Sequence, residues 1–445
     1  MQLKLYCNYG VVFTASAVFV SEGMHRGWSA PAYPKLSSSG ITNNDIMWLE
    51  AIYFLGELIS IPFAAYMVDR IGRKTTILLN TAVGLIAWTI IALSSRVVPF
   101  YVARFLAGAT GNISMVSVSI YISETANPTS RSWFLGVICF AQNLGTLMVY
   151  GLVPYFPFYV PSILANVVLV CQLVVFNFMP ESPYYHVLTK RENLARQALS
   201  KLRRHDNNDD EISTIKTTIK ANESQWENFK GIFGNKRNRK GLLIAVGLYA
   251  GLQFGGFSFT LMNVAYIFTK TKSQYLKSSL AEIVFAVLMI TGNVLCLLCL
   301  NKIGRKNLLL LSLTVSGLFL LGVGVYFTLM DSGLDLASVG WVSTLCITAY
   351  AVSFQLGFGS LIEPMSAELF STKSRALGTT FTNAVDAVFG VLAIVLCNFL
   401  VGNFGLSVTY YLFAGVSFLT IVFVGFFVPE TDGKSLQEIE GIFET

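Results

Sequence analysis

The feature that most constrains the fold is a series of long apolar segments. A helix needs about 20 apolar residues to cross the ~30 Å hydrocarbon core of a bilayer, and stretches of that length recur along the whole chain. Because 54% of the 445 residues are hydrophobic and only 13% are charged, the sequence predicts an all-α integral membrane protein. The twelve predicted spans are 9–30, 45–68, 75–93, 98–122, 131–153, 158–179, 241–268, 279–300, 307–329, 338–367, 377–401 and 406–428.

A polar segment divides these spans into two sets of six. It predicts an N-terminal six-helix bundle at 1–179, a linker at 180–240, a C-terminal six-helix bundle at 241–428 and a tail at 429–445.

The linker itself shows a helical pattern. Leu194, Ala198, Leu199 and Leu202 recur at helical spacing, which indicates short amphipathic helices between the halves. A plain tether between the bundles and a regulatory or lipid-contacting role for the basic end both fit this pattern.

The positions of Lys and Arg predict the orientation in the membrane. Most of the 31 basic residues fall in loops that share one side, and cytoplasmic loops are the ones that retain positive charge. We therefore expect a multi-pass protein of the cell membrane with both termini in the cytoplasm. The net charge of +6 follows from this insertion rule, and we expect no nucleic-acid partner.

Three short motifs recur in the same order in the two halves, each at a span end, which indicates a duplicated architecture. The pairs are "VDRIGRK" at 68–74 with "LNKIGRK" at 300–306, "ISETANPTSRSWFLG" at 122–136 with "SAELFSTKSRALG" at 366–378, and "MPESP" at 179–183 with "VPETDGKSLQEIE" at 428–440.

The charged residues of these motifs predict a gating network at the cytoplasmic face. Cations beside a tight Gly loop can reach helix C-terminal carbonyls and neighbouring carboxylates, so that making or breaking the network favours one orientation of the bundles. The alternative is that each group serves topology only. The network residues are Asp69, Arg70, Arg73, Lys74, Glu124, Arg131 and Glu181 in the first half, and Arg305, Lys306, Glu368, Arg375 and Glu430 in the second.

Taken together, the motifs resemble those of the sugar porters of the major facilitator superfamily, close to the insect facilitated trehalose and hexose transporters. "RFLAG" at 104–108 and "GLQFGGFSF" at 251–259 carry the resemblance further. It implies two pseudo-symmetric six-helix bundles around a central cavity that opens alternately to either side, with a small-molecule substrate near the midplane. A monomer in the lipid bilayer, without a cofactor, is expected.

The resemblance also implies substrate-binding residues. Gln142 and Gln253 match positions where such porters place an amide on the sugar, and an amide offers both a donor and an acceptor to adjacent hydroxyls. Elsewhere the cavity departs from the family pattern: Ser258 stands where Asn is usual, with Asn263 farther along, Glu363 stands where Trp is usual, and Asp386 stands where Asn is usual.

Ionisable residues inside spans are costly and are candidates for function. Arg104 matches a family Arg that faces span 1, where proton-coupled relatives carry an Asp; here that position is Met24. His25, Arg26 and Arg104 are the candidate coupling residues. Glu22 and Arg26 are four residues apart, so a paired Glu22 and Arg26 is also expected.

These features leave several functions open. A facilitative carrier of trehalose or a hexose is the first. A proton-coupled symporter and a carrier of a charged organic solute that uses Glu363 and Asp386 are the alternatives, and a sugar sensor without transport is a weaker one. No nucleotide-binding loop G-x-x-x-x-G-K-[ST] is present, and an enzyme, a cofactor and a metal site are not expected.

Overall fold

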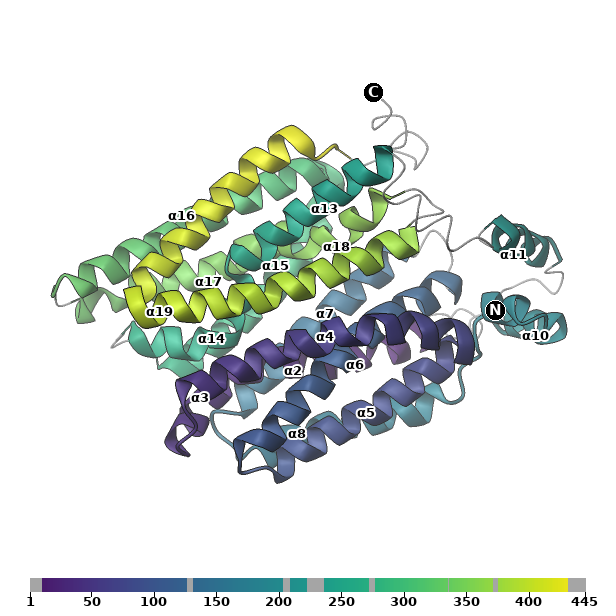
Figure 1. The fold of residues 1–445 in the computed structure, drawn as a ribbon, viewed down its shortest axis with the longest axis horizontal. Coiled ribbons are helices and arrows are strands. Elements are labelled where there is room, and N and C mark those ends of the chain that lie inside the picture. Colours follow the sequence, from purple (N-terminus) through teal and green to yellow (C-terminus); the bar gives the residue numbers. More distant parts are fainter. Residues whose placement is uncertain are drawn as a thin grey trace.

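The computed structural model describes residues 10–125, 131–202, 209–221, 236–271, 277–334, 336–370 and 375–430. Throughout these ranges the regular structure is helical (Figure 1). Nine of the described helices are long and apolar enough to cross a membrane, and Val137–Leu152 is a shorter apolar helix. The predicted all-α membrane fold is therefore confirmed.

The first half contains the first six crossings. Residues 10–16 are helical and lead into the first crossing, which continues as α2 and α3. The helices are α2 (Val18–Gly27), α3 (Ser29–Ser38), α4 (Asn43–Ile71), α5 (Arg73–Leu93), α6 (Val97–Thr125), α7 (Arg131–Leu152) and α8 (Tyr159–Phe176).

The second half repeats this plan. Its last helix is broken only at Gly405, whose φ of 85° interrupts a 53-residue run and separates two crossings. The helices are α13 (Lys236–Phe254), α14 (Phe257–Lys270), α15 (Ser278–Ile303), α16 (Arg305–Asp331), α17 (Gly340–Leu356), α18 (Phe358–Glu368) and α19 (Arg375–Phe427).

Three short helices are described between the halves, within residues 183–202 and 209–221. They are α9 (Pro183–Leu188), α10 (Glu192–Leu202) and α11 (Asp209–Ala221), and α10 and α11 lie beyond one end of the long helices (Figure 1). We call this end the linker end and the opposite end, near Ser38 and Lys270, the distal end.

The linker helices bury a small apolar cluster of their own. It comprises Val187, Ala195, Leu199 and Ile212. The predicted amphipathic pattern holds for Ala198, Leu199 and Leu202, which are buried, but Leu194 is exposed and Ala195 takes its place.

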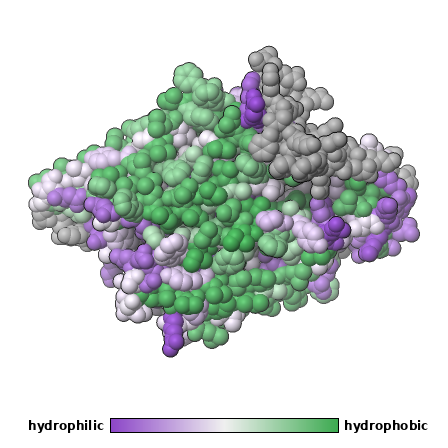
Figure 2. Space-filling view, in the orientation of Figure 1, coloured by the Kyte–Doolittle hydropathy of each residue, from purple (hydrophilic) through white to green (hydrophobic). Residues whose placement is uncertain are grey.

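The surface matches a membrane-spanning bundle. On the face shown in Figure 2, apolar residues cover the middle of the molecule and hydrophilic residues gather toward both ends. Because lipid tails solvate apolar side chains, exposed residues such as Phe63, Leu93 and Phe426 are at no disadvantage there.

Within the first half, glycines bring pairs of helices into close contact. A Cβ on Gly23 would lie 1.8 Å from the carbonyl oxygen of Gln142, and one on Gly145 would lie 1.9 Å from that of Val20. These contacts join α2 to α7, and Gly108 packs in the same way on the Tyr53 carbonyl of α4. Small residues allow such approaches where no hydrophobic effect drives helices together.

Three predicted spans differ from the observed helices. The first continues through α3 to Ser38 instead of ending at 30, so the predicted loop 31–44 is mostly helical. The seventh breaks at Gly256, where φ is 84°, and the tenth breaks at Gly357, where φ is −143° and ψ is −75°. Apolar composition predicts that a segment crosses the membrane, but it does not predict where the helix backbone is interrupted.

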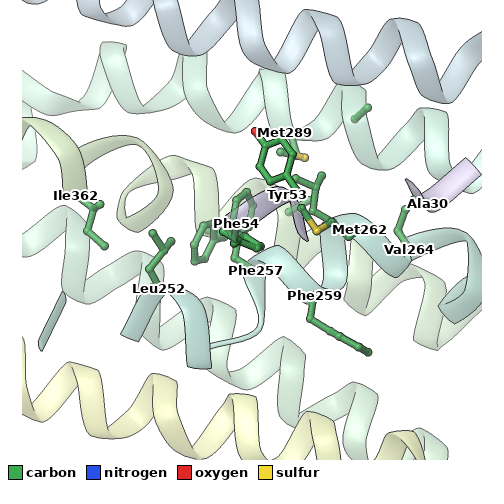
Figure 3. Packing of buried hydrophobic residues seen from close by; sticks show 14 of the residues in the cluster. Ala30, Tyr53, Phe54, Leu252, Phe257, Phe259, Met262, Val264, Met289 and Ile362 are labelled. Carbon is green, nitrogen blue, oxygen red and sulfur yellow. The ribbon is translucent and has the colours of Figure 1, made fainter. Parts of the chain in front are cut away.

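The two halves meet along an apolar seam. Phe54 of α4 packs against α19, where a Cβ on Gly390 would lie 2.4 Å from the Phe54 ring. Tyr53 and Phe54 of the first half belong to the same buried cluster as Leu252 and Phe257 of the second (Figure 3).

Candidate functional site

The first element of the site is a hydrogen bond within the second half. Gln253 Nε2 donates to Asp386 Oδ1 at 2.7 Å. Gln253 is fully buried, and its Oε1 has no hydrogen-bond partner among the described residues. It lies at the end of α13, directly before the break at Gly256 that ends the helix. An amide with one spare acceptor is therefore held beside an unwound segment.

Charged groups from both halves gather near this amide. The partly exposed Arg26 of α2 interacts electrostatically with Glu57 of α4, with Glu363 of α18 and with Asp386 of α19. Glu363 is exposed and directly follows the buried Leu361 and Ile362. Since it also interacts with Arg26, its exposed carboxylate faces the space between the halves. Arg26 thus interacts with three carboxylates, of which Glu57 also interacts with Arg104.

Gln142 approaches the same region from α7. Its backbone carbonyl touches Gly23, one turn from Arg26. Cys139, one turn earlier on α7, interacts with both Glu363 and Arg26. The half-buried Gln142 therefore stands on the helix face that adjoins the charged cluster.

The structure places Asn263 and Ser258 in other surroundings. Asn263 Nδ2 donates to Glu50 Oε2 of α4 at 3.0 Å and to the Phe259 carbonyl at 3.2 Å. Ser258 is buried, and its hydroxyl has no partner among the described residues. Asn263 is therefore committed to a contact between the halves.

That contact belongs to a set of bonds that closes the distal end. Tyr150 of α7 donates to the Leu261 carbonyl at 2.6 Å, and Ser29 of α3 donates to the Met262 carbonyl at 3.3 Å. Together with the Glu50–Asn263 bond, α7, α3 and α4 of the first half thus bond to three consecutive residues of α14. The rings of Tyr33 and Tyr266 meet farther out, with centroids 5.3 Å apart.

Arg104 is fully buried and is held by backbone carbonyls. Nε donates to Leu49 at 3.2 Å, Nη1 donates to His25, and the guanidinium lies 4.7 Å from the centroid of the Tyr53 ring. The His25 ring stacks on Trp88 with centroids 4.0 Å apart.

The expected Glu22–Arg26 ion pair is not formed. No ion pair within 4.0 Å involves Arg26 among the described residues, and its electrostatic partners are Tyr53, Glu57, Asp386 and Glu363 instead. Glu22 points toward α6, where one of its carboxylate oxygens would lie 3.0 Å from a Cβ on Gly111. The i,i+4 spacing places two residues on one face but does not make them turn toward each other.

At the linker end, the structure brings together most predicted network residues of the first half. Arg73 is 3% exposed and donates to both carboxylate oxygens of Glu124, each at 3.0 Å. Its Nη1 also lies 3.4 Å from Asp69. Ser182 donates to the same Glu124 carboxylate. Arg70 stands apart, since its guanidinium lies 5.9 Å from the centroid of the Tyr66 ring.

The Glu of the third motif closes the Gly loop of the first. Both oxygens of Glu181 accept from the Lys74 amide, at 3.0 and 3.1 Å, and Lys74 Nζ donates to the Asn177 carbonyl at 2.6 Å. A carboxylate at this helix start is favoured by the unpaired amides and by the helix dipole. Gly72, with φ of 101°, makes the turn.

The second half repeats this arrangement. Glu430 accepts from the amides of Arg305 and Lys306 at 3.2 and 3.1 Å, and Lys306 Nζ donates to the Gly425 carbonyl at 2.9 Å. Gly304 has φ of 82°. The side chains of Arg131, Glu368 and Arg375 lie outside the described part, so the predicted Glu-Arg pairs of the second motif stay predictions.

Comparison with known proteins decides the family. A model of the family described as "Sugar (and other) transporter" matches residues 8–443. The chain belongs to this family. It is therefore a membrane transporter and not an enzyme.

Relatives within the family differ in length. The chain is 27% identical over 445 residues to the facilitated trehalose transporter Tret1 of Bombyx mori, covering 99% of this chain and 87% of that protein. It is also 27% identical over 428 residues to Tret1 of Aedes aegypti, covering 94% and 53% respectively.

Solved structures share the fold of this transporter. The proton:xylose symporter XylE bound to 6-bromo-6-deoxy-D-glucose has a TM-score of 0.77 at 19% identity, covering 98% of this chain and 100% of that one. The xylose transporter XylE from E. coli, in a partially occluded inward open conformation, has a TM-score of 0.78 at 19% identity, covering 96% and 99%. These similarities confirm the major facilitator fold of two six-helix bundles.

Two residues of this transporter were missed by the sequence reasoning. Glu50 is 1% exposed inside α4, and its position seven residues before Glu57, on the same helix face, was the available signal. Lys35 donates to the carbonyls of Val153 and Phe156 at the distal end of α7. Its position after the predicted first span gave no hint of that contact.

Proposed function

We propose that the chain is a facilitative sugar carrier, for trehalose or a hexose, that works by alternating access. The observation that carries this proposal is the Gln253–Asp386 hydrogen bond beside the α13–α14 break, opposite Arg26 of the other half. Amide and carboxylate groups bind polyol hydroxyls well. The names of the Tret1 relatives support the substrate class.

In this mechanism the halves rock about the central site. Gln253 and Asp386 hold the sugar from the second half, and Gln142 and Arg26 hold it from the first. Glu363 and Ser258 contribute where the sugar extends toward α18 and α14. Closing the distal end makes the bonds to Leu261, Met262 and Asn263, and opening it breaks them.

The same proposal sets the membrane placement. The linker end faces the cytoplasm, both termini lie on that side, and the protein acts as a monomer in the lipid bilayer of the cell membrane. The Arg73 network holds the linker-end helices of the first half as a unit. That unit serves as a latch when the halves meet there.

Uptake by purified protein in liposomes tests the function. Labelled trehalose and glucose should enter saturably. Gln253→Ala should raise the KM about tenfold or more, because the loss of a buried hydrogen-bonding group costs about 1–3 kcal/mol. Gln172→Ala is the matched control: it is a buried amide in α8 that accepts from Thr81 at 2.7 Å, away from the seam.

Two results would overturn the assignment. Absence of saturable uptake for every sugar would remove the substrate class. Unchanged KM in Gln253→Ala at normal expression would remove this residue from the sugar site, and a larger KM change in Gln172→Ala would do the same.

One observation favours a second candidate. Three carboxylates, Glu57, Glu363 and Asp386, interact with Arg26, and Glu57 also interacts with Arg104, so with all five groups ionised the acids exceed the cations by one. A bound proton or a cationic organic solute would neutralise the excess negative charge of these carboxylates. Accumulation driven by an imposed proton gradient, or uptake of an organic cation without sugar uptake, would establish this candidate in place of the first.

A further inference from the structure

Glu50 makes a buried side-chain hydrogen bond between the halves. It lies about two turns from the distal start of α4, and its carboxylate accepts from Asn263 of α14 at 3.0 Å. Glu50 is 1% exposed and Asn263 is 8% exposed. The two residues are 213 positions apart in sequence, so this bond exists only when α4 and α14 are together.

The carboxylate is poorly provided with donors in this closed arrangement. Its Oε1 has no hydrogen-bond partner within 3.5 Å among the described residues. The donors near the carboxylate are neutral: the Asn263 amide bonds to Oε2, and the Ser29 hydroxyl interacts with the carboxylate but also donates to the Met262 carbonyl. A carboxylate that has lost its water usually accepts two or three bonds when it stays ionised. Closure therefore penalises the ionised form of Glu50.

The ionisable neighbours do not remove that penalty. Those that interact with Glu50 from other helices are Arg104 of α6, Tyr150 of α7 and Cys397 of α19. Arg104 is the only cation of the three. Its Nε donates to the Leu49 carbonyl and its Nη2 has no hydrogen-bond partner, but no ion pair within 4.0 Å joins it to Glu50 among the described residues.

We propose that Glu50 is a proton-binding group of the distal gate, by which we mean the bonds of Ser29, Glu50 and Tyr150 to α14. Glu50 is protonated when α4 closes on α14 and ionised when the gate opens to water. This inference rests on the proposed alternating access. Because the closed state binds the proton more tightly, linkage requires that low pH on the distal side favours closure and high pH favours opening. The protein would then adjust its outward-facing fraction to external pH, without any proton crossing the membrane.

The proposal can be tested without any transported substrate by measuring the distance between α3 and α14 across the distal gate. Spin labels at Ser38→Cys and Thr269→Cys, both exposed near the distal ends of α3 and α14, would report the open and closed fractions in nanodiscs. The accessible native cysteines are replaced in this background. The closed-to-open ratio is measured from pH 5.5 to pH 8.

For the wild type we expect the ratio to fall as pH rises, by up to tenfold per pH unit where one proton is linked. Glu50→Gln, which mimics the protonated form, should stay closed across this range. Asn263→Ala should open the gate at every pH and keep the slope. Glu22→Gln is the matched control, because Glu22 is a 3% exposed acid whose carboxylate lies beside Gly111 of the same half, and it should keep the wild-type slope.

A pH-independent ratio in the wild type would overturn the proposal, as would a slope that survives in Glu50→Gln or disappears in Glu22→Gln. The readout is separate from transport. Failed sugar uptake with an intact, Glu50-dependent slope would therefore reject the proposed substrate and leave the gate assignment standing.

Discussion

Arg73 and Glu124 form a two-point ion pair at the linker end, with Nε and Nη2 each 3.0 Å from a carboxylate oxygen. Their side chains are 4% and 13% exposed, so both charges are largely removed from water. The pair joins the start of α5 to the end of α6. Tyr184 and Tyr185 of α9 cover the guanidinium, with ring centroids 5.5 and 5.6 Å away.

The first prediction concerns this pair. Glu124→Ala should destabilise the protein by about 3 kcal/mol, because it leaves a buried guanidinium without its counter-ion. Arg73→Ala should do the same and also shift the balance of inward and outward forms. Thermal unfolding in detergent and a gate-distance measurement report the two effects. If the stability losses of Glu124→Ala and Arg73→Ala add up in the double variant, the two residues are not coupled. If the populations of inward and outward forms are unchanged in Arg73→Ala, the pair is not a latch.

A second prediction compares the two Gly loops. Gly72→Ala and Gly304→Ala both place a Cβ at positive φ with ψ near 160°, a backbone region that only Gly adopts readily and that costs another residue about 1–3 kcal/mol. The added Cβ would lie 2.5 Å from Glu181 Oε2 in the first loop and 3.1 Å from Glu430 Oε2 in the second. Gly72→Ala should therefore lower the Tm more. If the two variants have equal Tm values, or if Gly304→Ala has the lower one, Glu181 moves away from the added Cβ without cost.

These loops show what local sequence can predict. The turn, the Lys that reaches a carbonyl and the Glu of the third motif recur in both halves, and the structure places each pair alike, with Glu181 at Lys74 and Glu430 at Lys306. Such contacts depend on residues at fixed offsets from helix ends. A repeated motif therefore predicts a repeated contact.

The contacts of the distal gate could not be predicted from repeated local motifs. Whether Asn263 faces a sugar or Glu50 depends on the break at Gly256, which sets the direction of α14, and on how closely α4 approaches it. Neither the backbone break nor a contact across 213 residues follows from apolar patterning. The resemblance assigned Asn263 to the substrate, and the structure shows its amide bonded to Glu50.

The third prediction concerns the linker helices and pH. Lys216 of α11 lies 2.6 Å from Glu192 of α10, and its hydrogen bond, followed by its charge, holds the pKa of Glu192 below the ordinary value of 4.5. A lowered pKa in the folded state means that this stabilisation is complete above the unfolded pKa and is lost as pH falls through the folded value.

Contact between α10 and α11 should thus be constant from pH 6 to pH 8 and weaken below about pH 4.5. Glu192→Gln should show the weakened state at pH 7 and leave transport unchanged. Hydrogen exchange of residues 192–221 reports the contact. The same protection in the variant and the wild type at pH 7 would show that the apolar cluster around Leu199 is sufficient.

The fourth prediction separates the hydrogen-bonding role of Asp386 from its charge. Asp386→Asn keeps an oxygen that can accept from Gln253 Nε2, whereas Asp386→Ala removes it and leaves the buried amide without a partner. If the solute is a neutral sugar, Asp386→Asn should change the KM less than about threefold and Asp386→Ala about tenfold, since an unsatisfied buried group costs about 1–3 kcal/mol. Glu363→Gln should resemble Asp386→Asn. Uptake abolished equally in Asp386→Asn and Asp386→Ala would mean that the negative charge is required, and a proton or a cationic solute would then be the partner of this carboxylate.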